Sequence, residues 1–290
     1  MPLSRVSRLL AGLSLVLGLS GAALADEGMP HKNLRVCKDP NNMPFANQKG
    51  EGFEDRIAEL FGRKLGVEVE YFTFPQRLGF IRNTLRYKIP GQDYPCDIVM
   101  GVPAGWGQVD STKPYYRSTY VLVFAPGRSG LEGVKTEEDF LALPKDKLAK
   151  LKIGLFDRSP GSAWVAHHDL VDSGVPYKTM NPNPDEYPGQ IVERDLAEGK
   201  IDVAVVWGPV GAYYVKRVAS PELRAVPLVS EEGVRFDYEI AMGVRRGEPE
   251  WKAMVERFLD ENQTEITAIL DDYGVPTLAL GQGSGAANGR

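Results

Sequence analysis

The sequence predicts an α/β fold of two lobes joined by a hinge of two crossovers. Strands alternate with amphipathic helices, several strands are near-continuous apolar runs, and the second half of the chain repeats the pattern of the first. Alternation of strand and helix is typical of βαβ units around a parallel sheet. Because a chain that crosses twice between similar halves forms a hinge, closure around a bound molecule is expected.

Lobe one is predicted to comprise residues 30–125 and 236–278. Its first strand, LRVC, is followed by a turn over residues 39–45 and by an amphipathic helix that starts at Phe53. Apolar residues recur in that helix at the spacing of one helix face. An alternating strand begins at Val67, a second helix begins at Pro75, and DIVMGV (residues 97–102) is typical of a buried parallel strand.

Lobe two is predicted to comprise residues 126–235. The apolar run 119–126 is interpreted as the first crossover, and residues 237–245 as the return crossover. Within the lobe, LKIGLF predicts a strand, and residues 187–207 predict a helix followed by a buried strand. A helical run over residues 248–272 is expected to pack back on lobe one, and the low-complexity tail 279–290 is expected to be disordered.

The first 25 residues have the pattern of a secretory signal peptide. Arg5 and Arg8 precede an apolar core, and Ala23-Leu24-Ala25 predicts cleavage after Ala25 and export to the periplasm. A retained anchor is disfavoured because the core is short for a membrane span, and no later segment is apolar enough for membrane insertion. Loss of the two arginines changes the formal charge from −5 to −7, which argues against nucleic acid as a partner.

Cys37 and Cys96 are the two cysteines of the chain, and both remain after cleavage. In an exported protein such a pair predicts one disulfide. However, Cys37 ends one strand and Cys96 begins another, so a parallel arrangement would place them at opposite ends. Two buried thiols are therefore the alternative.

Candidate binding residues follow from the predicted sheet, because ligands of open α/β sheets lie beyond the carboxyl ends of the strands. They occupy two turns, the start of a helix in lobe two and the end of a strand: Asp39, Asn41, Asn42, Phe45, Gly101, Val102, Pro103, Trp106, Ser159, Gly161, Ser162 and Trp207.

Each group of candidates also has a purely structural interpretation. Asp39 could cap its own turn, and the serines could cap their helix rather than bind an anion. The aromatic residues are as compatible with a core as with a ligand platform; they are Trp106, Tyr115, Tyr116, Tyr120, Trp164 and Trp207.

The sequence favours neither a metal site nor a cofactor. His167 and His168 are adjacent on a predicted helix, so they cannot jointly face one ion, and His31 lies near the mature N-terminus. No phosphate-binding loop, nucleophile elbow or dinucleotide fingerprint is present in the sequence.

From residue 34 to about 276 the chain resembles solute-binding proteins of the amino-acid-receptor type, a type 2 clamshell. LRVCKDPNNMPF, GFEDRIAELFGRKLGV and DVAVVWG carry this resemblance. Together with PQRLGFIRNTLR and CDIVMGVPAG, the first of these is similar to the J-type (MxaJ/XoxJ-like) periplasmic proteins of methanol-oxidation operons. The resemblance implies a non-catalytic accessory protein that binds a PQQ-dependent methanol dehydrogenase, with that enzyme's cytochrome c as a further candidate partner.

Two departures from the amino-acid receptors affect the expected ligand. Those receptors hold the substrate carboxylate with an arginine after the strand that matches DIVMG, whereas residues 101–113 here contain none. They hold the ammonium with an aspartate where this chain has Gly208. Asp39 is the single acidic residue identified in the cleft turns, so an enzyme is not expected. The alternative function is an ABC-transporter receptor for a small polar or aromatic solute.

The mature protein is expected to begin at Asp26. The intact mass of protein purified from the periplasm tests this cleavage site. A mass that includes residues 1–25 would contradict it.

Overall fold

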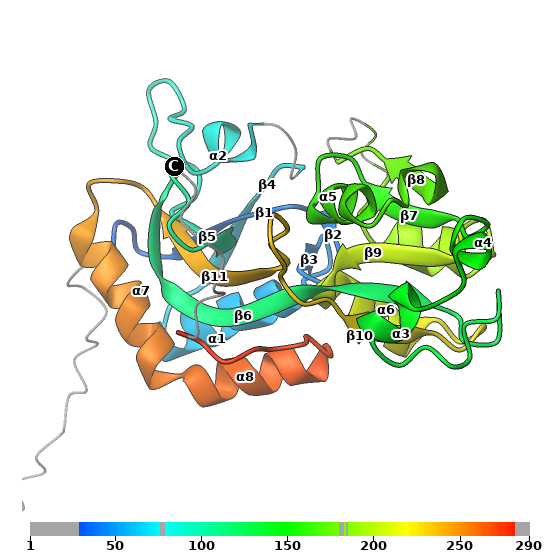
Figure 1. The fold of residues 1–290 in the computed structure, drawn as a ribbon. Coiled ribbons are helices and arrows are strands. Elements are labelled where there is room, and N and C mark those ends of the chain that lie inside the picture. Colours follow the sequence, from blue (N-terminus) through cyan, green and yellow to red (C-terminus); the bar gives the residue numbers. More distant parts are fainter. Residues whose placement is uncertain (1–28, 76–78, 180–182, 184, 282–290) are drawn as a thin grey trace, which may run out of the picture.

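The structure, a computed structural model, is built around a nine-stranded sheet (Figure 1). It describes residues 29–75, 79–179, 183 and 185–281; the predicted signal peptide and residues 282–290 lie outside the described residues. The strand order is β4-β1-β5-β11-β6-β9-β7-β8, and β10 also pairs with β6. The strands are β1 (Leu34–Lys38), β4 (Val69–Thr73), β5 (Ile98–Pro103), β6 (Asp110–Phe124), β7 (Ile153–Phe156), β8 (Gly174–Tyr177), β9 (Val203–Trp207), β10 (Arg224–Pro227) and β11 (Asp237–Val244).

Two lobes share this sheet because β6 is long enough to run through both. Its first part pairs antiparallel with β11 in lobe one, and residues 120–124 pair with β9 in lobe two. Residues 120–125 belong to lobe one in the prediction from sequence. Pairing puts 120–124 in the second sheet, where Val121 and Val123 face one core while Leu122 and Phe124 face another. We therefore propose a lobe boundary between residues 119 and 120.

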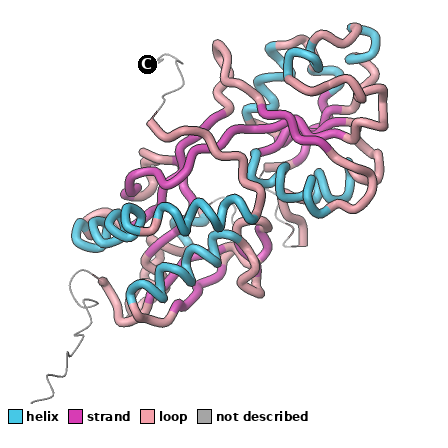
Figure 2. The backbone as a smooth tube through the Cα atoms, turned by 90° about the horizontal axis from the view of Figure 1, so that it is seen from below, coloured by secondary structure: helices cyan, strands magenta, loops and turns pink. Residues whose placement is uncertain are grey.

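Helices cover both faces of the lobe-one sheet. The large core lies between the sheet and α1, α7 and α8, and a smaller cluster lies beside α2. Figure 2 shows the strands continuing from this half of the molecule into the other. The predicted helical run 248–272 consists of two helices that meet at Asn262. The helices are α1 (Phe53–Leu65), α2 (Phe80–Asn83), α7 (Pro249–Glu261) and α8 (Gln263–Asp272).

Lobe two has one core on each face of its part of the sheet. One core contains Phe140 and Trp164 from the helices that follow β6, and the other contains Ile191 and Tyr213. None of the described helices combines the length and the apolar composition needed to cross a bilayer. The helices of this lobe are α3 (Glu137–Leu141), α4 (Lys145–Leu148), α5 (Pro160–His167), α6 (Gly208–Arg217), a 3₁₀ helix (Val171–Ser173) and a π-helix (Ile191–Leu196).

Two predictions about local order differ from the structure. The predicted helix from Pro75 is described as the four residues of α2, with residues 76–78 outside the described part of the chain. The start of the predicted disordered tail is attached to lobe one. The Ala279 carbonyl accepts a hydrogen bond from the Arg117 guanidinium, and the Gly281 N–H donates to Glu239 Oε1 at 3.0 Å.

Cys37 and Cys96 form a disulfide, with their Cα atoms 5.3 Å apart. Pairing of the cysteines is thus confirmed, and the objection from parallel strands fails because of the register. Cys37, near the end of β1, lies opposite Val99, the second residue of β5. Cys96 lies before β5, which begins at Ile98, so it is outside the parallel ladder and the segment that leads into β5 bends toward Cys37.

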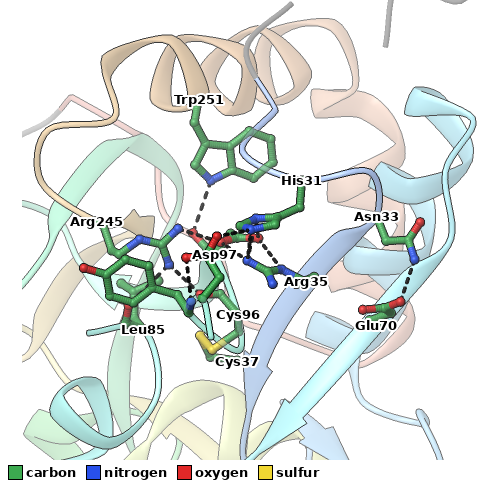
Figure 3. A network of polar contacts seen from close by, with 12 residues as sticks. His31, Asn33, Arg35, Cys37, Glu70, Leu85, Cys96, Asp97, Arg245 and Trp251 are labelled. Carbon is green, nitrogen blue, oxygen red and sulfur yellow. Dashed lines mark hydrogen bonds and ion pairs between the residues drawn. A yellow bond between two sulfur atoms is a disulfide. The ribbon is translucent and has the colours of Figure 1, made fainter. Parts of the chain in front are cut away.

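Asp97 is the centre of a polar network beside the disulfide (Figure 3). Its carboxylate, 2% exposed, lies 2.5 Å from Arg245 Nη2, 2.8 Å from Arg35 Nε and 3.0 Å from His31 Nδ1. The Trp251 indole donates to the Asp97 carbonyl at 3.2 Å. The network therefore connects the N-terminal segment, β1, β5 and the start of α7, and it stabilises lobe one as a single body.

We expect Asp97→Asn to lower the free energy of unfolding by about 3 kcal/mol, because Arg35 would lose its carboxylate partner and the buried Arg245 would retain only Glu248. Urea denaturation measures the loss. Asp93→Asn is the matched control, because Asp93 pairs with the same histidine but its side chain is 58% exposed. Equal losses in the two variants would contradict a special role for the buried carboxylate.

Candidate functional site

A cavity of about 550 Å³ lies between the lobes. This volume is within the range typical of small-molecule sites. Lobe one contributes the turn after β1, the end of β5 and the first turn of α1; lobe two contributes β8, the segment after it and the π-helix. Its aromatic lining residues are Phe45, Tyr116, Tyr120, Phe156, Tyr177, Tyr187 and Trp207.

One wall of the cavity is formed where a short hairpin lies on the start of α1. The hairpin consists of β2 (Asn41–Asn42) and β3 (Ala46–Asn47). The N–H groups of Phe53 and Glu54 donate to the Pro44 and Phe45 carbonyls at 2.8 and 2.9 Å. A Cβ atom at Gly52 would lie 1.9 Å from the Phe45 carbonyl oxygen, so glycine is required for this contact.

A buried ion pair fixes the position of this hairpin. Lys38 Nζ lies 2.9 Å from Asp55 Oδ1, and both side chains are almost fully buried. Asp55 also accepts hydrogen bonds from the Gly52 and Asn47 N–H groups at 3.0 and 3.1 Å. The end of β1, the hairpin and α1 are therefore joined at one carboxylate, and Phe45 and Glu54 reach the cavity from there.

Glu54 is an acidic residue of the cavity that was not predicted from the sequence, and Glu186 is another. The Glu54 side chain lines the cavity, and a Cβ atom on Gly101 would lie 2.2 Å from its Oε1 atom. Burial, together with the neighbouring Asp55 charge, raises the pKa of Glu54 to about 8. Within the described part of the chain, no hydrogen bond or ion pair reaches its carboxyl group.

Most of the predicted site residues do line the cavity. They are Asp39, Asn41, Asn42, Phe45, Gly101, Val102, Pro103, Ser159 and Trp207. Asp39 also has the structural role considered for it, because its Oδ1 accepts the Asn41 N–H at 2.8 Å. Whether these residues contact a ligand stays a prediction.

Trp106, Gly161 and Ser162 lie outside the cavity lining. Trp106 follows a turn closed by its N–H, which donates to the Pro103 carbonyl at 3.1 Å, and it packs against the cluster around the disulfide. A Cβ atom on Gly161 would lie 2.9 Å from Val205, so that position serves packing. The hydroxyls of Ser159 and Ser162 both donate to the Phe156 carbonyl, so Ser159 occupies the N-cap position of α5 without a side-chain capping hydrogen bond.

The aromatic residues divide between the two interpretations left open by the sequence. Tyr115 and Trp164 are core residues, whereas Tyr116, Tyr120 and Trp207 line the cavity. The histidines do not converge: His168 Nε2 lies 3.0 Å from Glu231 Oε1, and His31 belongs to the Asp97 network. The described residues contain no cluster of three or more His, Cys, Asp or Glu that could bind a metal.

Gly208, where the resemblance to amino-acid receptors predicts an aspartate, is sterically closed in this chain. A Cβ atom on Gly208 would lie 2.3 Å from the Thr119 carbonyl oxygen and 2.7 Å from Pro276. An aspartate there would require the crossover and the C-terminal segment to move. Glycine at position 208 is therefore explained by the close packing of this position against Thr119 and Pro276.

Comparison with known proteins shows relatives over nearly the whole chain. No family model matches it. Protein MoxJ of Paracoccus denitrificans is 27% identical over 277 residues, which cover 90% of this chain and 94% of MoxJ. The crystal structure of the periplasmic binding protein XoxJ from Methylobacterium extorquens AM1 is 34% identical, with a TM-score of 0.66, and the match covers 85% of this chain and 99% of XoxJ.

The chain belongs to the MxaJ/XoxJ-like family of periplasmic binding proteins. A second relative, Protein MoxJ of Methylorubrum extorquens, is 29% identical over 275 residues, 89% of this chain and 85% of that protein. The resemblance inferred from the sequence motifs is thus confirmed, as is the two-lobed α/β fold.

Several residues of this family member's cavity were not found from sequence. Tyr177 and Tyr187 come from β8 and the irregular segment after it, where no periodic pattern indicates which way side chains point. Glu54 had a detectable signal, since Glu54 and Asp55 are adjacent acids in the first turn of α1. Their opposite surroundings, one paired and one facing the cavity, depend on the hairpin.

The raised pKa of Glu54 predicts a pH-dependent difference between wild type and Glu54→Gln. The folded wild type keeps a proton that the unfolded chain releases above its ordinary pKa of 4.5. The wild type should therefore lose stability as pH rises from about 5 to 8. Glu54→Gln should raise the melting temperature relative to wild type at pH 8.5 and change it less at pH 5.

Glu59→Gln is the control for this measurement, because Glu59 is on the same helix but pairs with Arg56 at the surface. Its effect should be equal at the two pH values. If Glu54→Gln changed the melting temperature equally at pH 5 and pH 8.5, the pKa of Glu54 would not be raised in the folded protein, which would contradict the prediction.

Proposed function

We propose that this protein is a non-catalytic periplasmic accessory protein of methanol oxidation, which binds a PQQ-dependent methanol dehydrogenase and assists its maturation or activation. The observation that carries the proposal is the 34% identity with XoxJ across nearly all of that protein. The closed position at Gly208 supports it, because the cleft has lost the ammonium clamp of an amino-acid receptor.

The hinge suits a clamshell that closes on a segment of a partner. Arg117 Nη2 lies 2.6 Å from Asp237 Oδ1, and their side chains are 10% and 8% exposed. Ser230, in the segment that returns from lobe two, donates to the same carboxylate at 2.5 Å. The two crossovers are thereby joined, so lobe movement is expected to be a rotation about this pair.

A non-catalytic role fits the surroundings of Glu54. General acid catalysis requires an acid and a second group placed on opposite sides of the reacting atoms. Within the described residues Glu54 has no hydrogen-bonded base or cation beside it. The cavity therefore has the composition of a binding site, with aromatic walls and three acidic side chains, Asp39, Glu54 and Glu186.

The second candidate function is transport of a small polar or aromatic solute. It is favoured by the volume of the cavity and its seven aromatic lining side chains, since these are typical of small-molecule sites. A screen by thermal shift separates the two functions, because a ligand that binds only the native state raises its melting temperature.

We expect the mature protein to co-purify with a PQQ-dependent methanol dehydrogenase, and Tyr187→Ala to weaken the complex about tenfold or more. Tyr187 is a partly buried aromatic residue on the lobe-two wall of the cavity, and such residues are common interface anchors. Titration of the purified dehydrogenase measures the dissociation constant.

Trp106→Ala is the matched control, because Trp106 is an aromatic residue that packs away from the cavity. It should lower the melting temperature and leave the dissociation constant unchanged. Full-strength binding by a folded Tyr187→Ala variant would exclude this wall as the interface. Failure of the wild type to bind the dehydrogenase would overturn the proposed function.

A further inference from the structure

The cavity contains a carboxyl group with no counter-ion. Glu54 faces the cavity beside Gly101, and Lys38, the cation paired with the neighbouring Asp55, donates to that carboxylate and to the Asn47 carbonyl at 2.9 Å. Burying an acid in this way is unfavourable unless a cation or a proton neutralises it. An occupant of the cavity that carries a positive charge would supply that neutralisation.

The other charges that line the cavity leave this wall acidic. Asp39 and Glu186 are further carboxylates, and the described cations are Lys178 and Arg194, both from lobe two. Arg194 Nε lies 3.0 Å from Asp195, and Lys178 is exposed at the rim. The described lining therefore has no cation in contact with Glu54.

Aromatic side chains surround the same space. Phe45 comes from the hairpin that lies on α1, Tyr116 comes from β6, and Trp207 ends β9. Trp207 and Tyr120 are in edge contact, with ring centroids 5.4 Å apart. Aromatic faces attract cations through their quadrupole, and the attraction increases when the cation is desolvated.

We propose that the cavity binds an alkylammonium group with an apolar substituent, the ammonium hydrogen-bonded to Glu54 and the substituent packed against the aromatic residues. Two sources present this chemistry: a free amine in the periplasm, or a lysine side chain of the dehydrogenase. Binding of a lysine side chain rests on the proposed function, whereas binding of a free amine does not.

Binding of such a group is linked to a proton. With the pKa of Glu54 raised to about 8, the empty cavity holds a neutral carboxyl at pH 7, and an ammonium binds its ionised form. Binding should release a proton, and affinity should rise about tenfold between pH 6 and pH 7. An anionic ligand would show the opposite dependence, because it would require the protonated acid.

The test is calorimetric titration of the mature protein with benzylammonium chloride and with Nα-acetyl-lysine amide. Benzyl alcohol and benzoate are the matched ligands without charge and with the opposite charge. Titrations in two buffers of different ionisation enthalpy count the protons released. We expect an ammonium to bind with release of nearly one proton at pH 7. Tighter binding of benzylammonium would assign the site to free amines, and tighter binding of the lysine derivative to a protein side chain.

Glu54→Gln should weaken this binding at least tenfold and abolish its pH dependence, whereas Glu59→Gln should leave both unchanged. Gly101→Ala provides a second variant that keeps the charge, since the new Cβ atom would displace the Glu54 carboxyl. It should also weaken binding. Full-strength binding by both variants in folded form would overturn the proposal.

The ligand controls give further outcomes that would overturn it. They are equal affinity for benzyl alcohol, tighter binding of benzoate with affinity that falls as pH rises, or no binding of either ammonium. None of these titrations contains the dehydrogenase. If ammonium binding fails while the dehydrogenase still binds, this inference alone is wrong; the converse result overturns the proposed function alone.

Discussion

Lys38 and Asp55 form a buried ion pair where β1, the β2–β3 hairpin and α1 meet. Asp55 also accepts two backbone N–H groups, one from the hairpin and one from the residue before α1. Together with two hydrogen bonds from backbone N–H groups at the start of α1 to carbonyls of the hairpin, this carboxylate holds the hairpin against Gly52 and the start of α1. The positions of Phe45 and Glu54 in the cavity therefore depend on this pair, which is costly to break because each charge would be left buried.

The rest of lobe one makes this wall rigid. The disulfide joins the end of β1 to the segment before β5, and Asp97 connects that segment to Arg35 and Arg245. At the hinge, Arg117 and Asp237 join the two crossovers. Gly208 lies against the first crossover and Pro276. Closure of the lobes would therefore bring the lobe-two wall toward a fixed lobe-one wall.

Features of this fold that depend on local pattern were predictable from sequence. Apolar runs located β5 and β9, and a glycine followed by one face of apolar residues located α1. The incorrect predictions concern the direction in which side chains point, which tertiary contacts decide. Trp106 follows β5 as predicted but turns toward the disulfide cluster, and Ser162 donates to a carbonyl of its own turn. Glu54 differs from Asp55 through tertiary contacts, because Lys38 and the hairpin bind Asp55 whereas Glu54 faces the cavity.

We propose that a PQQ-dependent methanol dehydrogenase engages the cavity between the lobes. Hydrogen exchange of the mature protein, alone and with the dehydrogenase, tests it most directly. We predict protection of the amides in the hairpin, in the first turn of α1 and around Tyr187, with little change near Trp106. Protection confined to surfaces outside the cavity, in a complex that does form, would contradict the account.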